Sequence, residues 1–374
     1  LSLPQRRIAV IGANGSGKIQ LLTTMLQSLL MNHSAQEVHL YLLDYAASGL
    51  AAFLTAPQVG DVVHLNEDEK LIRLLMMLER EIEIRKEKLE GDLHAGSLEE
   101  RLQKAGLYHI VVVIHPLSAL QEKMAEDRSS LLRLLANGPS YGITFIATNS
   151  SASGLSYQIG QQFSRLFVLQ MPHDDDYMAL LGKTNGMQPE AIRGRGLVRL
   201  EKQLYEFQCA CTLTSSEACC EALNKAWTGK AAPRIAVMPE RIEAKRLIKT
   251  MKELSPASLP IGIGQRDLNP VCVNLEKYLV WQWIAREEDA DDFVSGFGEL
   301  VLAAGGELVI FGNSGRKQSD CVELYLSDFT AQSEYIKSYF FERIAEQKGQ
   351  LPAKHGHRVI IITRIADTLK ALAA

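Results

Sequence analysis

The sequence has no long hydrophobic run and no secretion signal. None of its apolar stretches approaches the roughly 20 residues that span a bilayer, and no signal-peptide pattern opens the chain. We therefore expect no membrane-spanning segment among the 374 residues. Because the chain begins at Leu1 rather than at a methionine, we expect it to be a piece of a longer protein, with any membrane anchor outside it.

The sequence also lacks an excess of basic residues and a metal-like cysteine pattern. Its formal net charge is −4 and its pI is about 6.2, whereas broad nucleic-acid binding usually shows as a basic surface. The hydrophobic fraction of 47% is typical of a globular protein, and the length suits two domains. The cysteine spacing predicts reduced thiols and no bound metal. The six cysteines are Cys209, Cys211, Cys219, Cys220, Cys272 and Cys321.

What is present is a glycine-rich loop. Residues 12–19 fit the phosphate-binding pattern G-x-x-x-x-G-K-[ST] up to the last position, between a predicted buried strand at 7–11 and a predicted helix at 20–30. Such a loop directs backbone N–H groups at a phosphate, and its lysine reaches the β and γ oxygens. The sequence therefore predicts an ATP site, with a ligand-free strand-to-helix turn as the alternative. The predicted binding residues are Gly12, Ala13, Asn14, Gly15, Ser16, Gly17, Lys18, Ile19 and Gln20.

This site lacks both residues that usually hold magnesium. Ile19 stands where a Ser or Thr hydroxyl is expected, and the strand predicted at residues 108–114 ends in His115 and Pro116 without a carboxylate. We interpret His115 as a packed or solvated loop histidine rather than a catalytic residue. The sequence thus predicts ATP binding with weak or absent Mg²⁺ binding, no catalytic residue and little or no hydrolysis.

Three more polar residues lie at the ends of two predicted strands, at the edge where ligands gather in a parallel sheet. Asp44 ends the strand at 37–44 and either supports the nucleotide site indirectly or is a solvated strand-end acid. Thr148 and Asn149 end the strand at 142–148 and either sense the γ-phosphate or cap the strand.

Strands alternate with helices along the first half, which predicts a parallel α/β sheet. A charged helix is expected from about residue 67 to 89, with its glutamates spaced for pairing against nearby cations along a solvated face. The residues concerned are Glu79, Glu83 and Glu87 with Arg80, Arg85 and Lys88.

The pattern then begins again at an offset of 270 residues, so that residues 7–11 overlay 277–281 and 37–40 overlay 307–310. The phosphate-binding positions are lost in this copy, and Lys18 becomes Glu288. We therefore expect a first domain at 1–228, a proline-punctuated linker at 229–258, and a degenerate, incomplete second copy at 259–374. The other replacements are Gln282 for Gly12, Ala285 for Gly15 and Glu287 for Gly17.

Several segments together resemble the FtsK/SpoIIIE class of P-loop motors. They are the loop at 12–18, residues 42–44, the turn at 57–63, the helix with Glu79 and Arg85, and residues 194–197 and 206–208. Tandem copies with decaying nucleotide sites are similar to the last two ATPase domains of the type VII secretion ATPases, EssC and EccC. The resemblance implies an α/β fold of tandem RecA-like P-loop NTPase domains, with mainly parallel sheets and flanking helices.

The resemblance also implies a cytoplasmic module at the cell membrane, anchored by segments outside this chain. The implied partners are WXG100-type export substrates, recognised through the second domain, and copies of the chain itself in a hexamer. Trp281 and Trp283, beside the altered loop, are candidates for the substrate pocket, with core aromatics as the alternative. Arg195 is a candidate contact between subunits.

Two alternatives stay open. A hydrolysing FtsK-like DNA translocase needs working ATP sites and a basic pore, and the missing acids and the acidic charge balance count against it. An active ATPase could instead recruit magnesium ligands from Asp44 or from a neighbouring subunit. We expect no nucleic-acid partner.

Overall fold

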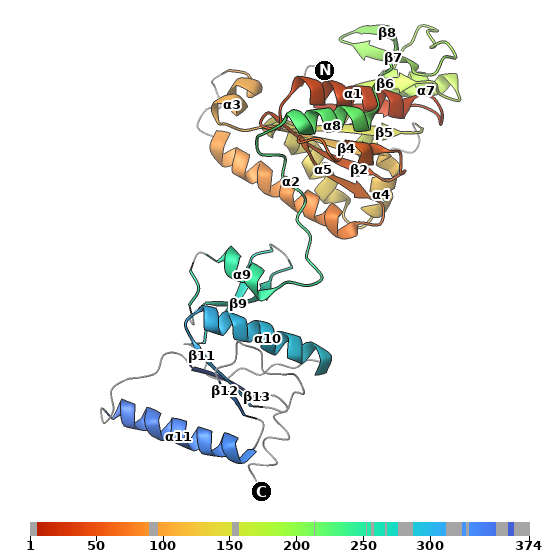
Figure 1. The fold of residues 1–374 in the computed structure, drawn as a ribbon. Coiled ribbons are helices and arrows are strands. Elements are labelled where there is room, and N and C mark those ends of the chain that lie inside the picture. Colours follow the sequence, from red (N-terminus) through yellow and green to blue (C-terminus); the bar gives the residue numbers. More distant parts are fainter. Residues whose placement is uncertain are drawn as a thin grey trace. The chain divides into compact units, whose positions relative to one another are not determined.

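The computed structural model divides the chain into two compact units, Leu1–Val237 and Met238–Ala374 (Figure 1). Each unit has its own sheet and its own apolar core. The structure describes residues 6–89, 96–151, 157–212, 214–251, 253–255, 258–265, 268–275, 287–311, 324–326, 329–348 and 358–362.

The first unit is built on an eight-stranded sheet with the order β3-β2-β4-β5-β1-β6-β7-β8. Neighbouring strands from β3 to β6 pair in parallel, and β7 and β8 extend the sheet in antiparallel pairing. This arrangement confirms the predicted α/β fold with a mainly parallel sheet. The strands are β1 (Arg7–Ile11), β2 (Val38–Asp44), β3 (Val59–His64), β4 (His109–His115), β5 (Ile143–Asn149), β6 (Arg165–Leu169), β7 (Arg195–Leu200) and β8 (Gln203–Gln208).

Helices cover both faces of this sheet (Figure 1). In β4, Ile110 and Val112 belong to the apolar cluster shared with α2, α4 and α5, whereas Val111 and Val113 belong to the cluster shared with α1 and α8. Because both faces are buried, residues 110–114 are apolar without interruption. The helices are α1 (Lys18–Asn32), η1 (Leu50–Phe53), α2 (Asp68–Leu89), α3 (Leu98–Lys104), α4 (Leu117–Lys123), α5 (Arg128–Asn137), η3 (Gly138–Tyr141), α6 (Tyr157–Gly160), α7 (Asp174–Leu181) and α8 (Ser216–Ala226).

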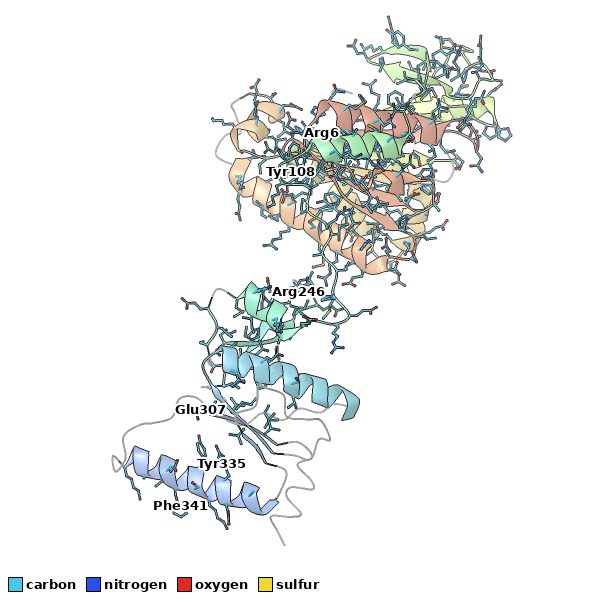
Figure 2. The ribbon with its side chains drawn as sticks, in the orientation of Figure 1. Arg6, Tyr108, Arg246, Glu307, Tyr335 and Phe341 are labelled. Carbon is cyan, nitrogen blue, oxygen red and sulfur yellow. The ribbon has the colours of Figure 1, made fainter. Side chains whose placement is uncertain are left out.

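Arg85 of α2 is fully buried, so the expectation of a solvated face was wrong for this residue. It lies one turn beyond Ile82 on the stripe that α2 turns toward the sheet. Its Nε donates to Glu81 (2.9 Å) and its Nη1 donates to the carbonyl oxygen of Tyr141 (2.8 Å). The guanidinium lies 5.1 Å from the ring centroid of Tyr108, which Figure 2 labels. A carboxylate one turn earlier on α2, together with Tyr108 and Tyr141 outside the helix, therefore makes the buried charge tolerable.

The chain that leaves α8 packs beside β3, the edge strand of the sheet. The N–H of Ala232 donates to the carbonyl oxygen of Pro57 (2.8 Å), and the Tyr41 hydroxyl donates to the carbonyl oxygen of Pro233 (3.1 Å). Ile235 is 5% exposed and joins the cluster that contains α2. These residues thus pack with the first unit, while the domain ranges given by the sequence remain a prediction.

The described part of the second unit contains a parallel sheet with the order β12-β11-β13 and an antiparallel pair, β9 with β10. Phe297, Leu300 and Val301 of α10 pack in one cluster with Leu308 and Ile310 of β11. Its elements are α9 (Ala244–Thr250), β9 (Leu259–Ile263), β10 (Pro270–Val273), α10 (Glu287–Ala303), β11 (Glu307–Phe311), β12 (Leu324–Leu326), α11 (Phe329–Gln347) and β13 (Arg358–Ile362).

The second unit repeats part of the first, in agreement with the predicted overlay of residues 37–40 on 307–310; the predicted overlay of 7–11 on 277–281 lies outside the described residues. The series α10, β11, β12, α11, β13 follows the same order as α1, β2, β3, α2, β4. In each series the first strand lies in the middle and pairs in parallel with the other two. Trp281 and Trp283 lie outside the described residues, as do Gln282 and Ala285.

Candidate nucleotide-binding site

The glycine-rich loop joins β1 to α1 at the carboxyl edge of the parallel sheet. Gly15 and Gly17 have φ angles of 82° and 105°, a region that side chains with a Cβ rarely adopt. A Cβ on Gly12 would lie 2.6 Å from Ser16 Oγ, so the loop closes tightly at its start. The backbone conformation of the predicted phosphate-binding loop therefore depends on its glycines.

Lys18 folds back onto the start of the loop. Its Nζ donates to the carbonyl oxygens of Gly12 (2.6 Å) and Ala13 (3.0 Å), and burial lowers its pKa. Gly17 is the N-cap of α1, whose first turn presents backbone N–H groups that no carbonyl of the helix accepts. The buried hydroxyl of Ser16 also has no hydrogen-bond partner among the described residues. A cation, unpaired N–H groups and an unpaired hydroxyl together fit an anionic phosphate.

The first turn of α1 also contains Ile19 and Gln20, both half-buried. Asn14 and Gly15 at the tip of the loop are exposed, and Ser150 Oγ donates to Asn14 Oδ1 (3.3 Å). Because its side chain is a hydrocarbon, Ile19 offers no oxygen at the position where magnesium is usually bound beside a phosphate-binding loop.

His115 ends β4 and is buried rather than solvated. Its Nδ1 shares a hydrogen bond with Thr148 Oγ1 at the end of β5. Burial lowers the pKa of His115; the charge of Asp44 opposes this shift and that of Lys18 adds to it. The imidazole is therefore disposed to stay neutral, and Thr148 pairs with it at the strand end.

Asp44 is 2% exposed, and its carboxylate holds the loop that follows β2. It accepts hydrogen bonds from the N–H groups of Ser48 (2.9 and 3.1 Å) and Leu50 (3.1 Å) and from the Ser48 hydroxyl (2.9 Å). Asp44 and His115 are register partners on the neighbouring strands β2 and β4, so the two groups lie in one neighbourhood. In this conformation Asp44 organises its own loop.

Asn149 lies directly beside the phosphate-binding loop. Its backbone carbonyl accepts from the N–H of Gly12 (3.2 Å), while its Nδ2 donates to the carbonyl oxygen of Ser151 (2.9 Å). Of the sequence candidates, the loop residues, Asp44 and Asn149 thus share one edge of the sheet. Within the part of the chain that the structure describes, no group of three or more His, Cys, Asp or Glu side chains is arranged to hold a metal ion.

A segment that sequence reasoning did not assign to this site packs against the loop. The N–H of Gly194 donates to the carbonyl oxygen of Ser16 (2.8 Å), and a Cβ on Gly17 would lie 2.8 Å from Gly194 N. The only sequence signal for this contact is a second Gly-x-Gly pair at 194–196. The segment before β7 is therefore part of the site.

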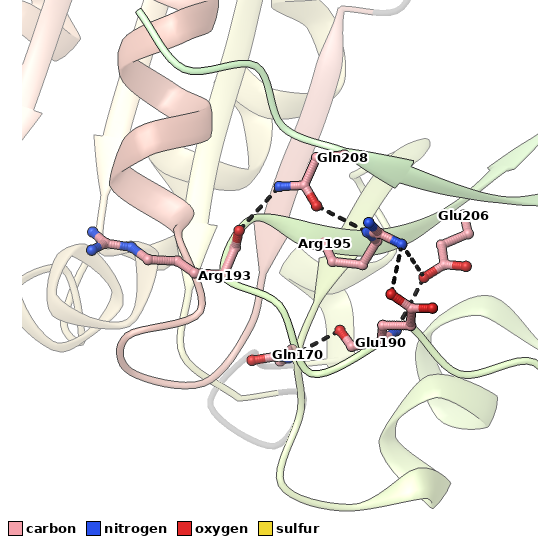
Figure 3. Close-up of polar contacts among 6 residues, drawn as sticks. All are labelled: Gln170, Glu190, Arg193, Arg195, Glu206 and Gln208. Atoms are coloured by element: carbon pink, nitrogen blue, oxygen red, sulfur yellow. Dashed lines mark hydrogen bonds and ion pairs between the residues drawn. The ribbon is translucent and has the colours of Figure 1, made fainter.

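Arg195, the candidate inter-subunit contact, makes ion pairs within its own chain. It pairs with Glu190 (3.2 Å) and Glu206 (3.5 Å), and its Nε donates to Gln208 (2.9 Å), as Figure 3 shows. The same figure shows Gln170 donating to the carbonyl oxygen of Glu190 (3.1 Å).

A parallel α/β sheet with this loop, this lysine and this helix defines a P-loop nucleotide-binding domain. The FtsK/SpoIIIE family model matches residues 3–184, a range that lies within the first unit. This match confirms the resemblance stated from the sequence, and the matched P-loop ATPase family implies nucleotide binding.

Curated relatives are type VII secretion proteins. The chain is 22% identical over 73% of its length to the ESX secretion system protein EccC of Geobacillus thermodenitrificans, and 25% identical over 71% to EccC of Thermomonospora curvata. It spans about a fifth of these relatives, 19% and 21% of their lengths. Among the residues described, no helix has the length and apolar character needed to cross a membrane.

Solved structures share the fold. EssC (ATPases 2 and 3) from Geobacillus thermodenitrificans has a TM-score of 0.81 at 18% identity. The match covers 96% of this chain and 72% of the EssC chain. Thermomonospora curvata EccC (ATPases 2 and 3) has a TM-score of 0.63 at 19% identity. The match covers all of this chain and 74% of the EccC chain. The predicted fold of tandem ATPase domains is confirmed.

Proposed function

We propose that this chain is a tandem module of a type VII secretion ATPase whose first domain binds ATP with little or no hydrolysis. The observation that carries the proposal is a complete phosphate cradle beside a strand end without an acid. Lys18 and the first turn of α1 form the cradle, whereas Ile19 and His115 occupy the positions from which magnesium is usually held.

Fast hydrolysis is disfavoured on electrostatic grounds. Magnesium offsets the charge that develops on the phosphates, and a neighbouring acid usually positions the metal and the attacking water. Here a side chain without oxygen and a buried imidazole of lowered pKa replace the two ligands. ATP then acts as a ligand that stabilises the folded state by mass action.

We propose that the second domain recognises export substrates of the WXG100 type. In support, one similar solved structure is described as EccC in complex with a signal sequence peptide. In this chain the sequence offset aligns the acidic Glu288 with Lys18, and an acid at that position would repel a phosphate. Trp281 and Trp283 are the proposed apolar contacts for such a substrate helix. The full-length protein would work at the cytoplasmic face of the membrane as a hexamer.

Isothermal titration of ATP, with and without Mg²⁺, tests the nucleotide part, with phosphate release followed in the same sample. We expect one site, lost in Lys18→Ala, with no dependence on Mg²⁺ and no released phosphate. Steady release that disappears in Lys18→Ala would overturn the silent-site proposal and favour an active ATPase. Absence of any ATP binding would overturn the nucleotide-binding proposal itself.

The substrate part has its own test. A fluorescent peptide with the C-terminal signal of a WXG100-type protein is titrated with the wild-type chain and with a variant carrying Trp281→Ala and Trp283→Ala. We expect binding to the wild type and at least tenfold weaker binding to the double variant. Equal binding to both would remove the two tryptophans from the proposal.

A further inference from the structure

Arg193 lies where the segment before β7 crosses the phosphate-binding loop. Its Cγ is 3.5 Å from the position that a Cβ on Gly17 would occupy, so the stem of its side chain runs over the N-cap of α1. Figure 3 shows the side chain extending toward that helix, away from Arg195. Arg193 is thus a cation placed beside the phosphate-binding loop.

The backbone that carries Arg193 is fixed on both sides. Gln208 Nε2 donates to the carbonyl oxygen of Arg193 (3.0 Å), and the next residue, Gly194, donates to Ser16 (2.8 Å). The N–H of Arg195 also donates to the carbonyl oxygen of Ile192 (2.9 Å). These bonds hold the segment against the phosphate-binding loop, so little backbone ordering remains when a ligand binds.

The charge of Arg193 remains available for a ligand. Nearby carboxylates of Glu190 and Glu206 pair with Arg195, two residues along the chain. The Arg193 side chain is exposed, and among the described residues its guanidinium makes no hydrogen bond or ion pair. The segment therefore has two arginines with different tasks: Arg195 holds the local structure, and Arg193 faces the solvent beside the loop.

We propose that Arg193 binds the phosphate chain of the nucleotide from outside the loop, as a second cation opposite Lys18. The inference rests on the proposed binding of ATP. A guanidinium can donate two parallel hydrogen bonds to phosphate oxygens, and it supplies positive charge where Ile19 and His115 provide no magnesium ligand. The unpaired hydroxyl of Ser16 independently indicates that this loop accommodates a polar ligand.

The test is titration of ATP without Mg²⁺ into the full chain carrying Arg193→Ala, Arg193→Lys or Arg80→Ala. Arg80 is exposed on α2 and provides the same charge change outside the site. For Arg193→Ala we expect affinity about three- to tenfold weaker, with a smaller salt dependence, because one exposed charge contact is removed. Arg193→Lys should keep part of the affinity, and Arg80→Ala should keep all of it.

If Arg193→Ala keeps the wild-type ATP affinity while Lys18→Ala no longer binds ATP, this inference is overturned and the proposed function still stands. Weakened self-association of Arg193→Ala at unchanged ATP affinity would overturn it in favour of a contact between copies. Equal losses in Arg193→Ala and Arg80→Ala would show a general charge effect and would also overturn it. Absence of ATP binding by the wild type would remove both proposals together.

Discussion

The two units share an order of strands and helices but differ at the start of the first helix. α1 begins at Lys18 and α10 at Glu287, and the sequence offset aligns the lysine with Glu288. A carboxylate at a helix start interacts favourably with the helix dipole but repels a phosphate. The two units thus share their order of strands and helices although an acid is aligned with Lys18, because apolar strands, and not the loop, hold the sheet together.

The largest expected effect is a loss of stability in the first unit that leaves the second unit unchanged. Arg85→Ala should lower the free energy of unfolding of the first unit by about 3 kcal/mol, because it leaves Glu81 without its cation and opens a cavity under Tyr108. The second unit should be unaffected. Urea unfolding followed by hydrogen exchange, resolved by unit, measures both. Arg80→Ala on the exposed side of α2 is the control, and an equal loss there would contradict the assignment.

The next effect concerns the loop that distinguishes the units. Gly17→Ala should weaken ATP binding at least tenfold and destabilise the first unit by about 2 kcal/mol, since it combines a φ of 105° with a 2.8 Å approach to Gly194 N. Gly262→Ala in the second unit is the control, because its Cβ would meet nothing within 4 Å. Titration calorimetry and thermal unfolding of both variants check this; full ATP affinity in Gly17→Ala would show that the loop is not the binding site.

A gain of function would sharpen the same comparison. Ile19→Thr combined with His115→Asp supplies a hydroxyl and a carboxylate at the two positions where the first unit lacks them. We expect Mg²⁺ to strengthen ATP binding of this double variant by about tenfold, and to leave the wild type unchanged. Titrations with and without Mg²⁺ measure the difference, with each single variant as control. If Mg²⁺ already strengthens wild-type binding by the same factor, the site has other metal ligands.

The smallest effect is a pH dependence of the first unit. Burial lowers the pKa of His39, His109 and His115 below the ordinary 6.5, so the unfolded chain binds more protons than the folded one as the pH falls through that value. Stability of the first unit is therefore expected to be complete above about pH 6.5 and to fall below it. Urea midpoints at pH 7.5 and 5.5 test this. His115→Asn should reduce the difference; an unchanged difference would exclude His115 as a contributor.

Much of the scaffold could be predicted because its signals are local. The strand expected at 108–114 is β4 at His109–His115, and the helix expected at 67–89 is α2 at Asp68–Leu89. Both follow from uninterrupted apolar runs or helical spacing, which depend on neighbouring residues only. The phosphate-binding loop was likewise predicted in its place between strand and helix.

What could not be predicted depends on partners distant in the chain. The burial of Arg85 requires the carbonyl oxygen of Tyr141, which is 56 residues away, and no charge pattern within the helix indicates it. The contact of Gly194 with Ser16 likewise exists only once β7 has joined the sheet beside β6. Asp44 is not solvated, because the turn at Ser48 occupies its oxygens, and its indirect support of the nucleotide site stays a prediction.

The short segment at 232–235 determines where a stable fragment of the first unit can end. A fragment that stops at the end of α8 would leave the Tyr41 hydroxyl without the carbonyl oxygen of Pro233 and would lose Ile235 from the apolar cluster. It would also uncover the flank of β3, whose position at the edge of the sheet makes it prone to pairing with other molecules. A fragment extended to Val237 should stay monodisperse at concentrations where the shorter one aggregates.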